Sequence, residues 1–181
     1  MDNKKADFKK CLDIGHYYEK KSIKILLKHN FIKVRNNYKY NPYYDLKAFK
    51  DHKRVYIEVK YNKLTHITNK IFLEVCKRNL EPSGITITKA QYYIFFSMYK
   101  YYICLVDDVK KLLEQTIRNI LINNNIENPT REQIILYIEH EAIKTNNTIG
   151  ILLSVSDVLK ICHYTGTHKK KNIYNKNLFK N

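Results

Sequence analysis

Residues 41–63 read NPYYDLKAFKDHKRVYIEVKYNK and predict a β-hairpin. Apolar and polar residues alternate in the segments 43–49 and 54–60, as expected for strands that bury one face. The polar pair Asp51-His52 lies between them and would form a two-residue turn. In that register the numbers of paired residues sum to 103, and the apolar residues of both strands share one face.

The same register places two carboxylates together on the polar face. Asp45 lies directly across from Glu58, where Cβ atoms are about 4.5–5.5 Å apart, and Lys60 projects from the same face. Two opposed like charges destabilise a hairpin, and a divalent cation between them removes the conflict. Mg²⁺ takes one or two carboxylates together with waters and phosphate oxygens. The pattern predicts a metal site; the alternative is a solvated face on which Lys47 or Lys60 pairs with the acids.

The triplet formed by Glu58 and Lys60 has little weight without this setting. An acidic residue followed two positions later by lysine occurs seven times in this lysine-rich chain. Only the copy at Glu58 lies in a run with strict strand alternation. The strand context, and not the triplet, therefore carries the prediction.

Composition predicts one folded domain. The chain has 181 residues, 44% hydrophobic and 28% charged, with few Gly and Pro. We expect a single domain over 1–167 and a basic, flexible tail over 168–181. The chain begins without an apolar signal segment and has no apolar run of the roughly 18–20 residues of a membrane span. We therefore expect no membrane contact and an intracellular protein, cytoplasmic or nuclear, or a viral protein in its host cell.

The net charge of +16 favours a polyanionic partner, because basic side chains that neutralise phosphates release counterions. The alternative is compositional bias, since 28 of the 33 basic residues are lysine, as in AT-rich genomes. Lys169, Lys170 and Lys171 form either a phosphate-binding arm or a solubilising run. The four cysteines form no Cys-x-x-Cys pair, which indicates free thiols rather than a zinc site or a disulfide framework.

The order of the remaining elements predicts an α/β fold with a central mixed β-sheet flanked by helices. Asp107 is the expected N-cap of one helix and Ser156 of another. The expected helices cover 6–29, 108–122, a segment after Pro129-Thr130, and a short stretch to His163; the expected strands outside the hairpin cover 31–35, 71–75, 92–96, 101–106 and 149–155.

Asp45 followed by Glu58-Val59-Lys60 on the next strand resembles the PD-(D/E)XK nuclease superfamily, which has the restriction-endonuclease-like fold. The resemblance extends from the first helix to about residue 97. Gly15-His16-Tyr17-Tyr18-Glu19 matches the first-helix pattern, and the segments 68–74 (TNKIFLE) and 83–93 (SGITITKAQYY) are similar to phage and viral members. Two positions depart from the pattern: Pro42 lies three residues before the aspartate, and Gln91 replaces an acid.

The resemblance implies an αβββαβ core, here with extra C-terminal helices, and a Mg²⁺-dependent DNA endonuclease in which Mn²⁺ can substitute. Asp45, Glu58, Glu19 and the Val59 carbonyl would bind metal, and Lys60 would position or help deprotonate the attacking water. Glu74 is a weaker candidate for the same site. Glu19 has the alternative role of a surface acid paired with a lysine, and Lys89 contacts either DNA phosphate or a nearby acid.

The resemblance further implies a role in DNA recombination, repair or processing, on branched or single-stranded DNA, and a homodimer. Two alternatives stay open at this point: a catalytically inactive nucleic-acid-binding protein of the same fold, and an RNA-directed nuclease. Convergence of the Asp45 and Glu58 carboxylates is the geometric condition for the catalytic alternatives. Divergence to opposite faces would leave only the binding protein.

Overall fold

The computed structural model describes residues 2–37, 41–79, 81–126, 129–130, 132–134 and 148–169, with the side chains described from residue 11 onward. Its helices are α1 (Asp2–Lys28), α2 (Thr65–Thr68), α3 (Val106–Asn123) and α5 (Val155–Ile161), with a 3₁₀ turn η1 (Gly84–Thr86). No helix among these residues is long and apolar enough to cross a membrane.

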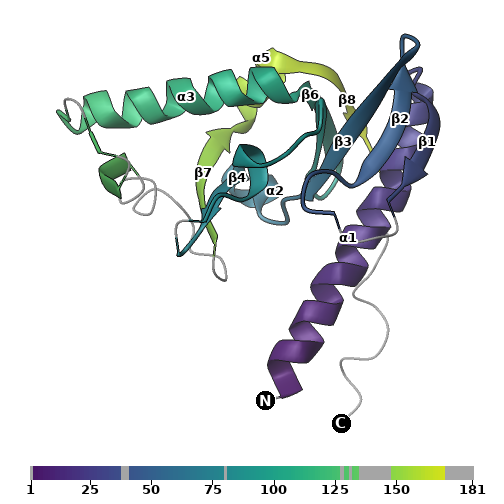
Figure 1. The fold of residues 1–181 in the computed structure, drawn as a ribbon, viewed down its shortest axis with the longest axis horizontal. Helices are drawn as coiled ribbons and strands as arrows, with labels where there is room; N and C mark the ends of the chain where they lie inside the picture. Colours follow the sequence, from purple (N-terminus) through teal and green to yellow (C-terminus); the bar gives the residue numbers. More distant parts are fainter. Residues whose placement is uncertain are drawn as a thin grey trace.

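A mixed sheet of six strands forms the centre of the molecule (Figure 1). Its strand order is β1-β2-β3-β5-β6-β8, with β3 parallel to β5 and the other neighbours antiparallel. The predicted α/β class with a central mixed sheet is therefore confirmed. The strands are β1 (Ile32–Asn36), β2 (Leu46–Lys50), β3 (Lys53–Tyr61), β5 (Tyr92–Phe96), β6 (Lys100–Leu105) and β8 (Cys162–Thr167).

The expectation of a single sheet is wrong, because two further strands pair only with each other. β4 (Lys70–Lys77) and β7 (Thr148–Ser154) form a separate antiparallel pair. Both lie where the sequence predicts strands, but the apolar pattern of a strand does not say which strand it pairs with. The β4–β7 pair packs against the face of the central sheet that bears Tyr93 and Phe95.

The predicted hairpin is confirmed in its register. Leu46 pairs with Ile57 and Ala48 with Val55, so that paired numbers sum to 103. The turn residues Asp51 and His52 have φ of 49° and 63°, as a two-residue turn of the I′ type requires. The first strand begins at Leu46 and not at residue 43, because residues 42–43 form a turn.

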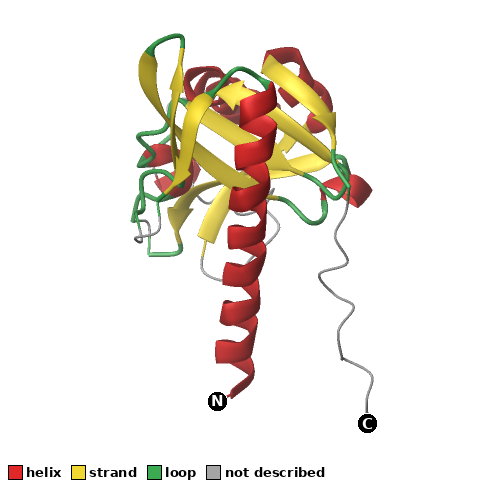
Figure 2. Cartoon of the chain, turned by 90° about the vertical axis from the view of Figure 1, so that its right-hand side faces the viewer, coloured by secondary structure: helices red, strands yellow, loops and turns green. Residues whose placement is uncertain are grey.

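The central sheet separates two apolar clusters. On one face, α1 packs against the hairpin and ends at Lys28, where Asn30 takes a left-handed φ of 63°, as predicted for the helix stop. On the other face lie β4, β7, α3 and α5 (Figure 1), and in the perpendicular view α1 crosses the sheet in front (Figure 2). The buried centres are Leu26, Phe31, Leu46, Ile57, Ile94 and Ile103 in the first cluster, and Ile71, Leu73, Tyr93, Phe95, Val109 and Ile151 in the second.

The C-terminal half differs from the sequence prediction in three places. Helix α3 begins at Val106, so Asp107 lies in its first turn instead of capping it. The cap of α5 is Ser154, whose hydroxyl accepts from the N–H of Asp157, and not Ser156. Strand β8 was not predicted: residues 162–167 are short and polar on one side, and they are a strand because β6 offers a free edge.

Parts of the prediction fall on undescribed residues. The helix expected after Pro129-Thr130 is seen only at 132–134, and its remainder lies outside the described residues. The same holds for 170–181, so the division into a domain and a tail stays a prediction. The four cysteines are free thiols, as predicted, at Cys11, Cys76, Cys104 and Cys162.

Gly84 holds β4 in place near the candidate site, and its replacement should destabilise the protein. It has a φ of 55°, and a Cβ there would clash with the Glu74 carbonyl oxygen. We expect Gly84→Ala to lower the free energy of unfolding by about 1–3 kcal/mol in urea titrations. Gly15→Ala is the control: a Cβ on this α1 residue meets nothing within 4 Å, and should stabilise the helix slightly. Equal effects of both variants would contradict this account.

Candidate functional site

Asp45 is fixed at the point where the β2–β3 ladder ends. The Val59 N–H donates to its Oδ2 at 2.7 Å, and its own N–H donates to the Ile57 carbonyl at 2.9 Å. The side-chain carboxylate thus takes the place of a main-chain partner for β3. N–H and C=O of one strand residue point to the same side, so the Val59 carbonyl faces this end of the hairpin too.

Glu58 lies on the polar face of β3 and is only 8% exposed. Its Oε1 accepts from the Lys60 ammonium at 3.0 Å. Its neighbour on the parallel strand β5 is Tyr93, in the second apolar cluster. A carboxylate this buried is costly without partners, and Lys60 is one such partner.

Glu58 is close enough to Asp45 to affect the ionisation of that carboxyl group. Burial, and next the Glu58 carboxylate, raise the pKa of Asp45 to about 7, although the Val59 N–H and Lys60 act against the rise. The Asp45 and Glu58 carboxylates therefore interact electrostatically, and the short separation of their oxygens that the catalytic alternatives require stays a prediction. Near neutral pH the folded protein therefore keeps Asp45 partly protonated beside the Glu58 carboxylate.

Lys60 is held in its charged form. Burial alone would lower the pKa of its ammonium, but Glu58, Asp45 and Glu74 together raise the pKa above its ordinary value. A protonated ammonium can orient a water molecule and stabilise negative charge, but it cannot accept a proton. The structure favours these roles over the deprotonation of water that the sequence also left open.

Two further acids surround the pair. Glu74 comes from β4 and acts electrostatically on Lys60 and on Tyr93. Glu19 comes from α1; it contributes to the raised pKa of Asp45, and its Oε2 accepts from the Asn36 amide at 2.6 Å. Within the described ranges, no three Asp, Glu, His or Cys side chains form a ready-made metal site. Of these acids, Asp45 and Glu58 are the pair that would bind a metal directly.

Tyr93 adjoins Glu58, although the sequence predicts only a strand over 92–96 at this position. Its hydroxyl is buried and has no hydrogen-bond partner among the described residues, while its ring stacks on Phe95. Burial, and then the carboxylates of Glu58, Glu74 and Asp45, raise its pKa. Its place beside Glu58 follows from the β3–β5 pairing, which the sequence pattern does not show.

The lysines predicted to contact nucleic acid are only partly placed. The Lys89 ammonium lies 4.4 Å from the ring centre of Tyr43, and the main-chain N–H of Lys89 donates to the Tyr43 carbonyl. Lys89 therefore lies beside the segment that leads to Asp45. Lys169 is exposed, and its carbonyl accepts from Lys21 on α1. Lys170 and Lys171 lie outside the described residues.

A basic groove that was not predicted lies on the hairpin. It has a volume of about 310 Å³ and is lined by four exposed cations, Lys33, Arg35, Lys47 and Arg54, together with Ala48 and Phe49. Among the described residues none of the four cations forms an ion pair. Strand alternation places Lys47 and Arg54 on the face of Glu58, which is the signal that could have identified the groove.

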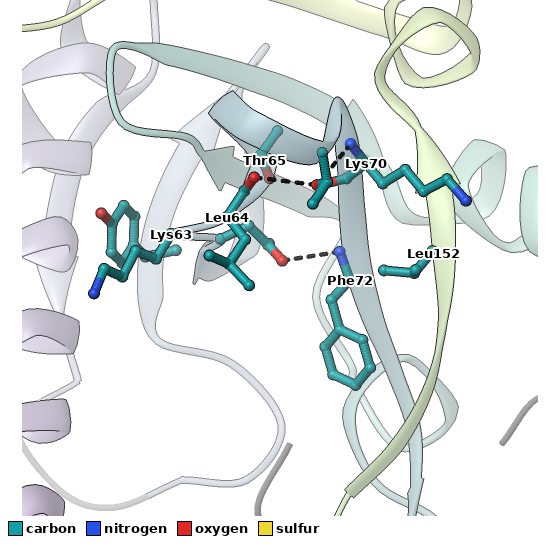
Figure 3. Close-up of a pocket in the computed structure, with 9 residues that line it drawn as sticks. Lys63, Leu64, Thr65, Lys70, Phe72 and Leu152 are labelled. Carbon is teal, nitrogen blue, oxygen red and sulfur yellow. Dashed lines mark hydrogen bonds between the residues drawn. The ribbon is translucent and has the colours of Figure 1, made fainter. Parts of the chain in front are cut away.

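A larger cavity opens at the other end of β3, between that strand and β4 (Figure 3). Its volume is about 510 Å³. It is lined by Tyr61, Asn62, Lys63, Leu64, Thr65, Thr68, Lys70, Phe72 and Leu152. Along β3 the order is therefore basic groove, carboxylate pair with Lys60, and cavity.

Comparisons with protein-family models, with curated proteins and with solved structures find no match for this chain. The site is defined by its own chemistry: two carboxylates that interact electrostatically and an adjacent ammonium, between a cation-lined groove and a cavity.

Proposed function

We propose that this protein is a Mg²⁺-dependent nuclease of the restriction-endonuclease-like fold that hydrolyses phosphodiester bonds in DNA. One observation carries the proposal: Asp45 lies at the end of the hairpin ladder, and burial, followed by the Glu58 carboxylate, raises the pKa of Asp45 to about 7. A fold that keeps two buried like charges together is suited to a bound cation. Lys60 beside them supplies the third member of the motif.

The strand order supports the fold assignment. Helix α1 is followed by three antiparallel strands, then by α2, and then by β5 parallel to β3. This is the order of an αβββαβ core, with β4 inserted before the last strand. The catalytic motif would lie directly before β2 and on β3 in that core, where Asp45 and Glu58 are found.

The donor set fits Mg²⁺, a hard cation that prefers oxygen ligands. Asp45, Glu58 and the Val59 carbonyl would hold it directly, and Glu19 through water. The buried Tyr93 hydroxyl, which has no partner among the described residues, would donate to a carboxylate or to an ordered water there. When bound, Mg²⁺ supplies Lewis-acid stabilisation of the charge that develops on the phosphoryl oxygens.

The protein's own groups would position the reactants. The Lys60 ammonium, 3.0 Å from Glu58 Oε1, would orient the attacking water and stabilise negative charge on the phosphate. The carboxylates of Glu58 and Asp45 would accept hydrogen bonds from that water and fix its lone pair toward phosphorus. Each role requires only that the side chains keep the positions they have.

The basic groove supports a nucleic-acid substrate. The Phe49 side chain lines the groove, and the Lys33 ammonium and the Arg54 guanidinium lie 5.7 Å and 5.9 Å from the centre of its ring. Arg54 precedes Glu58 by four residues, roughly 13 Å along the strand. Phosphates that flank the cleaved bond would lie over these cations.

We expect Lys47→Ala combined with Arg54→Ala to weaken duplex binding and to reduce its salt dependence. Each lost phosphate contact lowers the slope of log K against log salt concentration by about 0.9, so the slope should fall by about 2. Fluorescence anisotropy with Glu58→Gln protein measures binding without cleavage. The matched control, Lys110→Ala combined with Arg118→Ala, removes the same charge from exposed positions of α3, and should leave the slope unchanged. Equal slopes in both double variants would exclude the groove.

The proposed function is tested by incubating the protein with Mg²⁺ or Mn²⁺ and with duplex, single-stranded, flapped and branched DNA, and with RNA of the same sequences. Cleavage of DNA that EDTA abolishes is the expected result. Cleavage of RNA alone would replace DNA by RNA as the substrate. Tight binding with no cleavage of any substrate would leave a catalytically inactive nucleic-acid-binding protein.

A further inference from the structure

The cavity at the end of β3 is a direct neighbour of the carboxylate pair. Asn62, the first residue after β3, follows Glu58 by four residues, and Phe72 precedes Glu74 by two residues on β4. Four residues of a strand span roughly 13 Å, about the length of two nucleotide steps in an extended chain. A strand bound with its cleaved phosphate at Asp45 and Glu58 would therefore place a nucleotide about two steps away at this cavity.

The cavity walls suit a flat, mostly apolar group. Tyr61, Leu64, Phe72 and Leu152 supply carbon surface, and Figure 3 shows Leu64 on the α2 side opposite Phe72 and Leu152 on the strand side. Its volume of about 510 Å³ is within the range of small-molecule sites. Aromatic and aliphatic walls of this kind bind nucleobases by stacking, with little preference for sequence.

Polar groups are placed at one wall and at the rim. The Asn62 Oδ1 accepts from the Phe72 N–H at 2.9 Å, which orients the amide and leaves its Nδ2 hydrogens for a ligand. Lys63 and Lys70 stand at opposite sides of the opening (Figure 3). No acidic residue lines the cavity. A base with acceptor atoms on its edge, attached to phosphate, complements this arrangement.

We propose that this cavity receives one unpaired nucleotide of the substrate, and that the enzyme therefore selects nucleic acid in which a duplex meets a single strand. A base paired in a duplex is covered on both faces and on its edge, so only an unpaired or extruded base can enter. The basic groove, on the other side of the carboxylate pair, contacts phosphates alone and takes the duplex. This inference rests on the proposed function, because it assigns the substrate to the same site.

The test uses Glu58→Gln protein and DNA duplexes with or without a single-stranded extension. A 2-aminopurine base is placed in turn at the first, second or third unpaired position, and its fluorescence reports stacking. We expect a fluorescence change on binding at one position only. Phe72→Leu keeps an apolar side chain on β4 but removes the ring. It should abolish that change and weaken binding of the extended duplex about tenfold, with blunt-duplex affinity unchanged.

Two further variants separate recognition from folding. Asn62→Asp still accepts from the Phe72 N–H but loses the amide donor, so it should weaken only the extended duplex. Ile67→Ala, on α2, is the control, since Ile67 is 73% exposed and does not line the cavity. It should change neither affinity.

The outcomes distinguish this inference from the proposed function. Cleavage of DNA without any fluorescence change, or an equal loss of both affinities in Phe72→Leu, would overturn the inference and leave the nuclease. A position-specific change that depends on Phe72 would support the cavity. If the position-specific fluorescence change is seen but the wild-type protein cleaves no substrate, the cavity inference stands and only the proposed nuclease function is overturned.

Discussion

Glu58→Gln is expected to reduce Mg²⁺-dependent cleavage by at least about 10³-fold while the protein remains folded. The amide has nearly the same shape as the carboxylate, so packing at this 8%-exposed position is kept. What is lost is one of two negative charges that would hold the cation, together with the charge that pairs with the Lys60 ammonium. Single-turnover rates at saturating protein measure the chemical step without the contribution of product release.

The matched control is Glu114→Gln on α3, where an exposed glutamate loses the same charge far from the site. Its cleavage rate should equal that of the wild type. Lys60→Met should cost about 10²–10³-fold, because the orienting ammonium is removed. Full activity in both Glu58→Gln and Lys60→Met would reject the site.

The contribution of Asp45 to the free energy of unfolding, measured in EDTA, is expected to decrease as the pH rises from about 4 to about 7. In the unfolded chain Asp45 loses its proton near its ordinary pKa of 3.8, whereas in the folded protein it keeps the proton until about pH 7. Between these values the folded state binds more protons, so raising the pH favours unfolding. The slope due to this group is at most about 1.4 kcal/mol per pH unit.

Asp45→Asn isolates this contribution. His29 and His168 have pKa values lowered mainly by burial, which stabilises the folded state as pH rises and so opposes the effect of Asp45. The difference between wild type and Asp45→Asn contains the aspartate contribution alone. We expect the variant to be more stable than the wild type at pH 8 in EDTA, because the like-charge pair is gone, and to be inactive.

Mg²⁺ links the two predictions. A cation that binds the ionised pair should raise the melting temperature of the wild type more at pH 8 than at pH 5, where Asp45 keeps its proton. The melting temperature of Asp45→Asn should respond weakly at both values. This readout needs no substrate. Identical responses of the two proteins would show that the cation binds elsewhere.

Much of the site could be predicted from sequence because its parts are local. Alternation in two neighbouring segments and a two-residue turn determine the hairpin register, which the structure confirms from Leu46–Ile57 to Lys50–Lys53, with Asp45 directly before the ladder. Lys60 follows from the same alternation. The prediction extended the first strand to residue 43, since a pattern does not show where a side chain replaces the main chain as a partner, as Asp45 does for Val59.

Other parts depend on pairings between distant segments. Tyr93 lies beside Glu58 because β5 aligns parallel to β3, and Glu74 reaches the site because β4 pairs with β7, about 80 residues later, outside the central sheet. The edge strand β8 exists because β6 has room for it. Periodicity shows that a segment is a strand, but not which neighbour it takes.

The sequence by itself thus determined the hairpin, its register and the placement of Lys60 beside Glu58, since contacts between adjacent strands are specified by alternation and turn chemistry. Only the tertiary structure decided how buried the pair is, that Lys60 stays charged, and that a cation-lined groove and a base-sized cavity stand on either side. Burial, ionisation and cavities are properties of surfaces brought together from the whole chain, and no local pattern encodes them.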